Sequence, residues 1–181
     1  MRTATIMTNL LNKQKNQDSG CLPQSGAKNG SAPVIFTKEQ ITLRICKLIV
    51  RLIRNHVEED RGGPHTRIFT HMLHPEQDYV LTGISSNFSE GKDRHVEHVV
   101  PCVVMISMTK ELIQEGRLSD EQLAILMMRN WKVAILTKEE AKTIDQKLGL
   151  KTRMPESWSY EHGDPMARLT AAGITLISSD L

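Results

Sequence analysis

Apolar positions early in the chain follow a helical spacing. In the stretch "TKEQITLRICKLIVRLIRNHVEED", which begins at Thr37, they recur every three or four residues, at Ile41, Ile45, Leu48, Ile49 and Leu52. This spacing places them along one face of an α-helix, and the Thr37 hydroxyl can cap its first turn. The sequence "RGGP" at 61–64 supplies glycine and proline where such a helix ends. We therefore expect one long amphipathic helix over residues 37–60.

The later part of the chain alternates strand-like and helix-like patterns. A Val-rich run over 95–104 predicts a strand, which leads into the helical pattern "MISMTKELIQEG". A second helical pattern follows in "LSDEQLAILMMRN", where Ser119 and Gln122 have the spacing of a capping box. The apolar run "WKVAILT" then predicts a short strand, and "KEEAKTIDQKLGL" a helix that Thr137 caps and Gly149 ends.

These patterns predict a mainly helical α+β protein with a single domain. Residues 12–33 are rich in Asn, Gln, Ser, Gly and Lys and have little to bury, so we expect a disordered tail over 1–33. Residues 34–92 should form a helical and mixed N-terminal part. Residues 93–150 should form a unit of strands and helices, and 151–181 a C-terminal extension.

Composition fits a globular protein of this size. The 181 residues suffice for one domain and a tail, and with 39% hydrophobic but only 4% aromatic residues the core should be aliphatic. The net charge of +2 is nearly balanced, so it neither supports nor excludes a nucleic-acid partner. The sequence contains no Gly-rich phosphate loop and no GxSxG motif, which argues against P-loop and serine-hydrolase chemistry.

Cysteine usage and apolar runs bear on the compartment. Cys21, Cys46 and Cys102 are an odd number, lie far apart and form no CxxC pair, so neither a disulfide framework nor a cysteine zinc site is indicated. The N-terminal stretch has no apolar run of secretory length, and charged residues or histidines interrupt the other apolar stretches well before about 18 residues. We expect a cytoplasmic protein that is neither exported nor membrane-spanning.

The stretch "DRHVEHVVPC" at 93–102 carries the most specific pattern. An acidic residue stands directly before a histidine, and two valines and a proline follow, as Glu97-His98-Val99-Val100-Pro101. Asn130, the strand-like "KVAIL" and a helix with acidic residues in its first turn come later, in that order. Over residues 93–150 this order resembles the HNH, or ββα-metal (His-Me finger), endonucleases.

The resemblance implies metal-dependent hydrolysis of DNA phosphodiester bonds in a bacterium or a phage-infected cell. It makes His98 the general base, and Glu97 and Glu140 the metal ligands. Asn130 would hold the connection or the histidine ring in place. A histidine can take a proton from water near neutral pH, and Mg²⁺, or alternatively Mn²⁺, needs only one or two carboxylates. Lysines around the second strand and the last helix could contact phosphates, namely Lys132, Lys138 and Lys142.

The same residues also have ordinary structural interpretations. Glu97 and His98 could be a polar pair at the end of a strand. His95, two residues before Glu97, could be a second ligand or a substrate contact. Glu140 lies three residues after Thr137, where it can complete a capping box. The lysines could equally form a solvated face.

The chain also departs from the pattern of the family. The helix ligand there is usually His or Asn, but here Ala141 stands where a histidine is sought, and Glu139 competes with Glu140 for the role. Asn130 could merely cap its helix, and its separation from Pro101 is long for a hairpin. The departure at Ala141 favours the alternative of a non-catalytic nucleic-acid or protein interaction factor, for instance a phage-encoded one, that keeps the fold.

Overall fold

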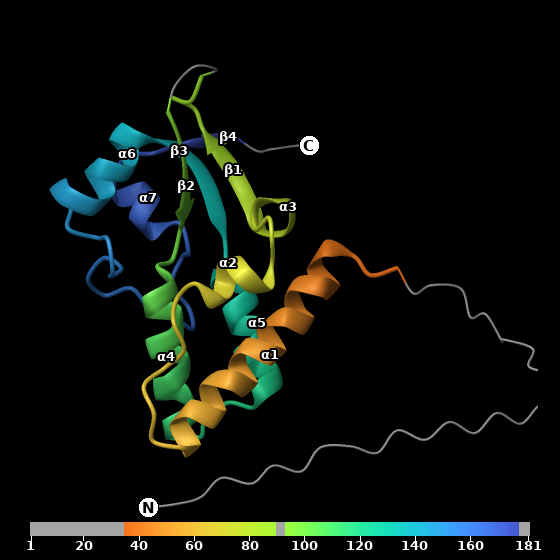
Figure 1. The fold of residues 1–181 in the computed structure, drawn as a ribbon. Helices are drawn as coiled ribbons and strands as arrows, with labels where there is room; N and C mark the ends of the chain where they lie inside the picture. Colours follow the sequence, from red (N-terminus) through yellow and green to blue (C-terminus); the bar gives the residue numbers. More distant parts are fainter. Residues whose placement is uncertain (1–34, 90–92, 178–181) are drawn as a thin grey trace, which may run out of the picture. The chain divides into compact units, whose positions relative to one another are not determined.

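The computed structural model describes residues 35–89 and 93–177, and the tail expected over 1–33 lies outside them. Within the described residues, helices pack around a four-stranded sheet (Figure 1). The chain is therefore a helix-rich α+β protein, as its patterns predicted. None of the described helices has both the length and the apolar character that a bilayer span requires.

Helix α1 (Lys38–Glu58) begins where the sequence predicted. Thr37 accepts a hydrogen bond from the Gln40 amide, and the Gln40 side chain accepts one from the Thr37 amide, which completes a capping box. The buried side chains of the helix are those of Thr42, Cys46, Ile49, Val50 and Ile53. Leu48, which the spacing placed on the buried face, is 53% exposed instead. The prediction was wrong at Leu48 because the helices that pack against α1 determine which of its faces is buried.

Helices α4 (Cys102–Glu115) and α5 (Asp120–Asn130) pack against α1 and against each other (Figure 1). Ser119 caps α5 through the predicted capping box with Gln122. The core beneath these helices is mainly aliphatic, as expected from composition. Aromatic rings also enter it: Phe69 meets Trp131 edge to face, with ring centroids 4.9 Å apart.

The sheet brings together strands that are far apart in the chain. Its order is β2 (Arg94–His98), β3 (Val133–Thr137), β1 (Leu81–Ser85) and β4 (Leu176–Ile177). Strand β3 lies inside the sheet and is buried at every position. It runs parallel to β1 and antiparallel to β2, with His98 opposite Val133 at one end and Arg94 opposite Thr137 at the other.

The strand predicted over 95–104 is shorter than expected. It ends at His98, and Cys102 already begins α4. Pro101 explains the early change, because proline lacks an N–H and its ring favours the backbone angles found at a helix start. The cysteine thus lies in the first turn of a helix rather than inside a strand.

Short helices complete the fold. Helix α6 (Lys138–Lys142) follows β3 directly and continues into a π-helical turn, η1 (Thr143–Lys147). The antiparallel pair of β2 and β3 followed by α6 is the order of elements that the sequence predicted for this unit. The other short helices are α2 (Ile68–Met72), α3 (Gln77–Val80) and α7 (Ala167–Ala171).

Candidate functional site

His98, the last residue of β2, binds a buried carboxylate. Its Nε2 atom lies 2.8 Å from Oε1 of Glu76, which is only 5% exposed. The same Glu76 oxygen accepts a hydrogen bond from the indole N–H of Trp131, also at 2.8 Å. Glu76 directly precedes α3, so a residue from a distant part of the chain fixes the histidine ring.

This environment keeps the His98 ring charged. Burial disfavours the charged form, but hydrogen bonds and charge interactions with Cys102 and Glu76 outweigh it and raise the pKa of His98 to about 10. Burial likewise acts to raise the pKa of Glu76, yet its hydrogen bonds to His98, Trp131 and Thr70 hold that pKa below the usual range. His98 is therefore an imidazolium near neutral pH, and in this state it has no free lone pair with which to act as a base.

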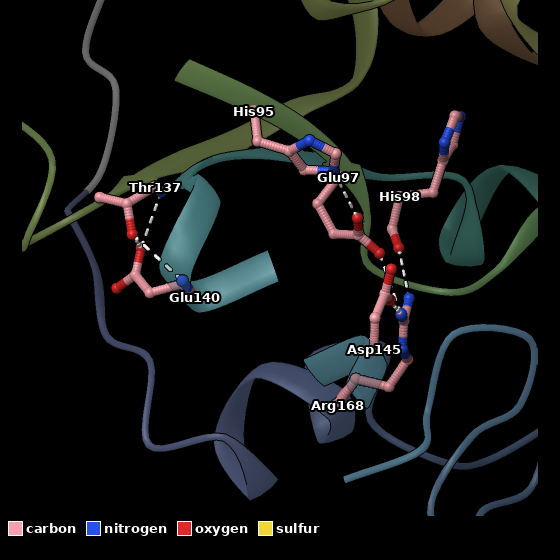
Figure 2. Close-up of polar contacts among 7 residues, drawn as sticks. All are labelled: His95, Glu97, His98, Thr137, Glu140, Asp145 and Arg168. Atoms are coloured by element: carbon pink, nitrogen blue, oxygen red, sulfur yellow. Dashed lines mark hydrogen bonds and ion pairs between the residues drawn. The ribbon is translucent and has the colours of Figure 1, made fainter. Parts of the chain in front are cut away.

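Glu97 contacts a different set of partners from His98, as expected for neighbours in a strand (Figure 2). One carboxylate oxygen lies 2.9 Å from Nη2 of Arg168, and the other 3.0 Å from Nε2 of His95. Arg168, from α7, is 1% exposed, and its Nη1 donates to the His98 carbonyl oxygen at 2.8 Å. A fourth side chain, that of Asp145, approaches Arg168 at 3.8 Å.

The ion pair of Arg168 and Glu97 is close but poorly aligned. Nη2 of Arg168 is within salt-bridge distance of Glu97 yet does not meet the geometry of a hydrogen bond. Its Nε atom is buried and has no hydrogen-bond partner among the described residues. We attribute the contact with Glu97 to charge rather than to a directed bond, which leaves donor capacity on the guanidinium.

Glu140 completes the capping box of α6. Its Oε2 atom accepts from the backbone amide and the hydroxyl of Thr137 at 2.9 and 3.0 Å, and its Oε1 atom from the hydroxyl of Ser85 and the side-chain amide of Asn87 at 2.6 and 3.0 Å. Partial burial acts to raise the pKa of Glu140, but these hydrogen bonds keep it below the usual range. Both oxygens of the carboxylate are thus used by the protein itself.

The two predicted metal ligands are not brought together. Glu97 lies opposite Ala134 in the sheet. Thr137, to which the Glu140 carboxylate is hydrogen-bonded, comes three residues after Ala134 in β3, a separation of about 10 Å along the strand. Figure 2 shows Glu140 beside Thr137 and Glu97 beside Arg168, each with its own partners. Over 35–89 and 93–177, no group of three or more His, Cys, Asp or Glu side chains is placed to hold a metal ion. The donors in this arrangement do not fit a divalent cation.

Asn130 is fully buried at the end of α5. Its side-chain amide donates to the carbonyl oxygens of Leu126 and Tyr160 at 3.0 and 3.1 Å. The residue thereby connects α5 to the segment around Tyr160, and its side-chain amide does not hydrogen-bond to His98.

The three predicted phosphate-binding lysines lie at separate places. Lys138 pairs with Asp93 at 2.8 Å, Lys142 is exposed at the end of α6, and Lys132 is half-buried just before β3. The pocket next to His98 has a different set of cations in its wall, Arg67, Lys151 and Arg168.

This pocket lies where β2 ends and α4 begins. Its volume is about 320 Å³, and besides the cations it is lined by Glu97, His98, Cys102, Thr66, Thr70 and Thr152. A larger pocket of about 600 Å³ adjoins α3 and β1, but no His, Cys or Glu is among the described residues that line it. The smaller pocket is therefore the one that contains Glu97 and His98, whereas the larger one contains Lys38, Asp78, Tyr79 and Arg94.

Sequence reasoning missed Glu76, Cys102 and Arg168. Glu76 and Arg168 lie 22 and 70 residues from His98, and no local pattern connects them. Cys102 could have been noticed, because it stands four residues after His98, just beyond the proline that starts α4.

No protein-family model, curated protein or solved structure matches the chain.

Proposed function

We propose that the pocket at the end of β2 binds a phosphate group of the DNA backbone. The observation that carries this proposal is the lining by Arg67, Lys151 and the buried Arg168. Guanidinium groups match the geometry of phosphate oxygens, and a lysine adds a point charge. Arg168 also has a buried Nε atom without a partner among the described residues.

The first turn of α4 adds donors to the same pocket. Pro101, Cys102 and Val103 line it, and no described side chain caps the helix there. The amides of Val104 and Met105 donate to the Pro101 carbonyl oxygen, whereas those of Cys102 and Val103 have no acceptor within the helix. A phosphate at a helix N-terminus accepts such hydrogen bonds and is favoured by the helix dipole.

The net charge of the residues that line the pocket also favours the binding of an anion. His98 is an imidazolium, and Glu97, the one carboxylate among the described lining residues, is paired with Arg168 and His95. The local positive charge therefore exceeds the negative, although the whole chain carries only +2. With DNA as the partner, the cytoplasm of a bacterium or a phage-infected cell is the setting we propose.

Metal-dependent hydrolysis of DNA is the second candidate function. It is favoured by the antiparallel pairing of β2 and β3 with α6 directly after them, which is the order of elements in the ββα-metal endonucleases that the sequence resembles. A plasmid-nicking assay with Mg²⁺ or Mn²⁺ tests it on the unmodified chain, His98→Ala and Glu97→Ala. If the unmodified chain nicks the plasmid and both variants do not, hydrolysis of DNA replaces phosphate binding as the proposed function. If none of the three proteins nicks the plasmid, or all three do so equally, hydrolysis is excluded as the function of this site.

Salt-dependent DNA binding tests the first proposal. Fluorescence anisotropy with a labelled duplex gives Kd at several NaCl concentrations for the unmodified chain and Lys151→Ala. We expect weaker binding and a slope of log Kd against log salt that is reduced by about 1. Lys147→Ala removes an exposed lysine outside the pocket and is the matched control. Equal effects of the two substitutions, or none, would contradict a phosphate at this pocket.

A further inference from the structure

We infer that the pocket at the end of β2 binds the phosphate that ends a DNA strand, a phosphomonoester, in preference to a phosphodiester within the strand. The inference rests on the proposed function and specifies which phosphate the pocket takes. Three features of the pocket carry it: the balance of its charges, the origin of its hydrogen-bond donors and the burial of Arg168. Each of these features fits a terminal phosphate better than an internal one.

The charges that line the pocket leave two cations over. Arg168 pairs with Glu97 at 2.9 Å, and the His98 ring pairs with the carboxylate behind it at 2.8 Å. The side chains of Arg67 and Lys151 form no ion pair within the part of the chain that the structure describes. A phosphomonoester carries a charge of about −1.5 to −2 at neutral pH, whereas a phosphodiester carries a single negative charge. The two remaining cations therefore match the terminal group more closely.

Hydrogen-bond donors enter the pocket from separate parts of the fold. Arg67 directly precedes α2, Lys151 follows η1, and the amides of Cys102 and Val103, which have no acceptor within the helix, belong to α4. A phosphate within a strand has two of its oxygens esterified to sugars, but a terminal phosphate presents three acceptor oxygens. Donors that come from three directions are thus used more fully by the terminal group.

Arg168 is the most buried of the pocket cations. It is 1% exposed although it lines the pocket, whereas Arg67 and Lys151 are exposed. Figure 2 shows its guanidinium directed at Glu97 and at the His98 carbonyl oxygen. Its Nε atom is buried and has no hydrogen-bond partner among the described residues. A ligand approaches this guanidinium only by entering the pocket.

A terminal phosphate can enter where an internal one is held back. The pocket has a volume of about 320 Å³, which suits a small group rather than a duplex. An internal phosphate has a sugar on each side, and these keep it at the surface of the DNA helix. A terminal phosphate is joined through one ester oxygen and projects beyond the last sugar. It can therefore come closer to the buried Arg168.

The experiment compares DNA ends that differ only in their terminal group. A hairpin DNA with a fluorophore in its loop has one free end, which carries a 5′-hydroxyl, a 5′-phosphate or a 5′-phosphate methyl ester. A fourth hairpin carries a 3′-phosphate, so that the two kinds of strand end are distinguished. Fluorescence anisotropy gives the Kd of the full chain for each hairpin. The methyl ester keeps a phosphate at the end but has the charge of a phosphodiester.

We expect a terminal phosphate, at the 5′ or the 3′ end, to lower Kd at least about tenfold relative to the hydroxyl end, because hydrogen bonds to charged groups are each worth about this factor. The methyl ester should lack most of this gain. Lys151→Ala and Arg67→Gln should each reduce the ratio of the two Kd values. Lys147→Ala should leave the ratio unchanged, because Lys147 is exposed outside the pocket. Far-UV circular dichroism checks that each variant is folded.

Equal Kd values for all the hairpins would overturn the inference, and so would a preference for phosphate that Lys151→Ala and Arg67→Gln leave intact. If the Kd values are equal but Lys151→Ala still weakens binding more than Lys147→Ala, the proposed function stands and only the inference fails. If no hairpin binds, both fail. Thymidine 5′-monophosphate is the competitor: if it binds as tightly as the phosphorylated hairpin, the pocket recognises a phosphomonoester without DNA, which also contradicts both.

Discussion

Nε2 of His98 lies 2.8 Å from Oε1 of Glu76, and 22 residues separate the two along the chain. The pair joins the end of β2 to the residue before α3, and the Trp131 indole donates to the same Glu76 oxygen. It also decides the charge of the site, because a histidine held by a buried carboxylate keeps its proton. His98, which the sequence pattern predicted to be a general base, is therefore a cation in this structure.

Stability should fall at alkaline pH because of this pair. His98 has a pKa of about 10 in the folded protein, but about 6.5 when the chain is unfolded. Its contribution is therefore fully present below pH of about 6.5 and is lost as the pH rises to about 10. We expect urea unfolding to show a loss on the order of 1–3 kcal/mol over this range. In His98→Gln, the free energy of unfolding should fall less over the same pH range, because the titrating histidine is absent. An identical pH dependence in the two proteins would contradict the attribution of this loss to His98.

Removal of Arg168 should be among the most destabilising single changes. Arg168→Met leaves Glu97, which is 13% exposed, with only the His95 contact, and removal of one partner from a buried ion pair costs about 3–5 kcal/mol. Arg117 pairs with Glu115 and Glu161 on the surface, so Arg117→Met should cost less than about 1 kcal/mol. Guanidinium chloride unfolding measures both. Adding Glu97→Gln to Arg168→Met should recover part of the loss, and no recovery would speak against a charge pair.

Glu140 should act as a helix cap. Glu140→Ala removes four hydrogen bonds and should lower the free energy of unfolding by about 1–2 kcal/mol. Its exposed neighbour supplies the control, Glu139→Ala, which should change stability by less than about 0.5 kcal/mol. Calorimetric titration with Mg²⁺ should give the same result for all three proteins. A Mg²⁺ signal that only Glu140→Ala removes would make this residue a ligand after all.

Local features of the fold were predictable from the sequence, and the site was not. The capping residues Thr37, Ser119 and Thr137 and the strand–helix order around β3 all depend on neighbours a few residues away, and all three capping boxes are present. The face of α1 was misplaced at Leu48 because it depends on helices distant in sequence.

The partners of the Glu97–His98 pair are nonlocal in the same way. Glu76 precedes a four-residue helix and Arg168 lies in a five-residue one, and neither segment has a pattern that points to β2. Sequence order could place a histidine at the end of a strand, but it could not show that a buried carboxylate would hold the ring protonated. Glu140 shows the converse case, since its local capping pattern was complete in the sequence and is what the structure displays.

The most direct test of a phosphate site at the end of β2 is a ¹H–¹⁵N NMR titration of the full chain with a short DNA duplex. We predict that the largest chemical-shift changes fall on the amides of Arg67, Cys102, Val103 and Lys151, which line the pocket, and that these changes diminish as NaCl is raised. Changes concentrated on the exposed face of α1, around Lys47 and Arg51, with the pocket amides unmoved, would contradict it.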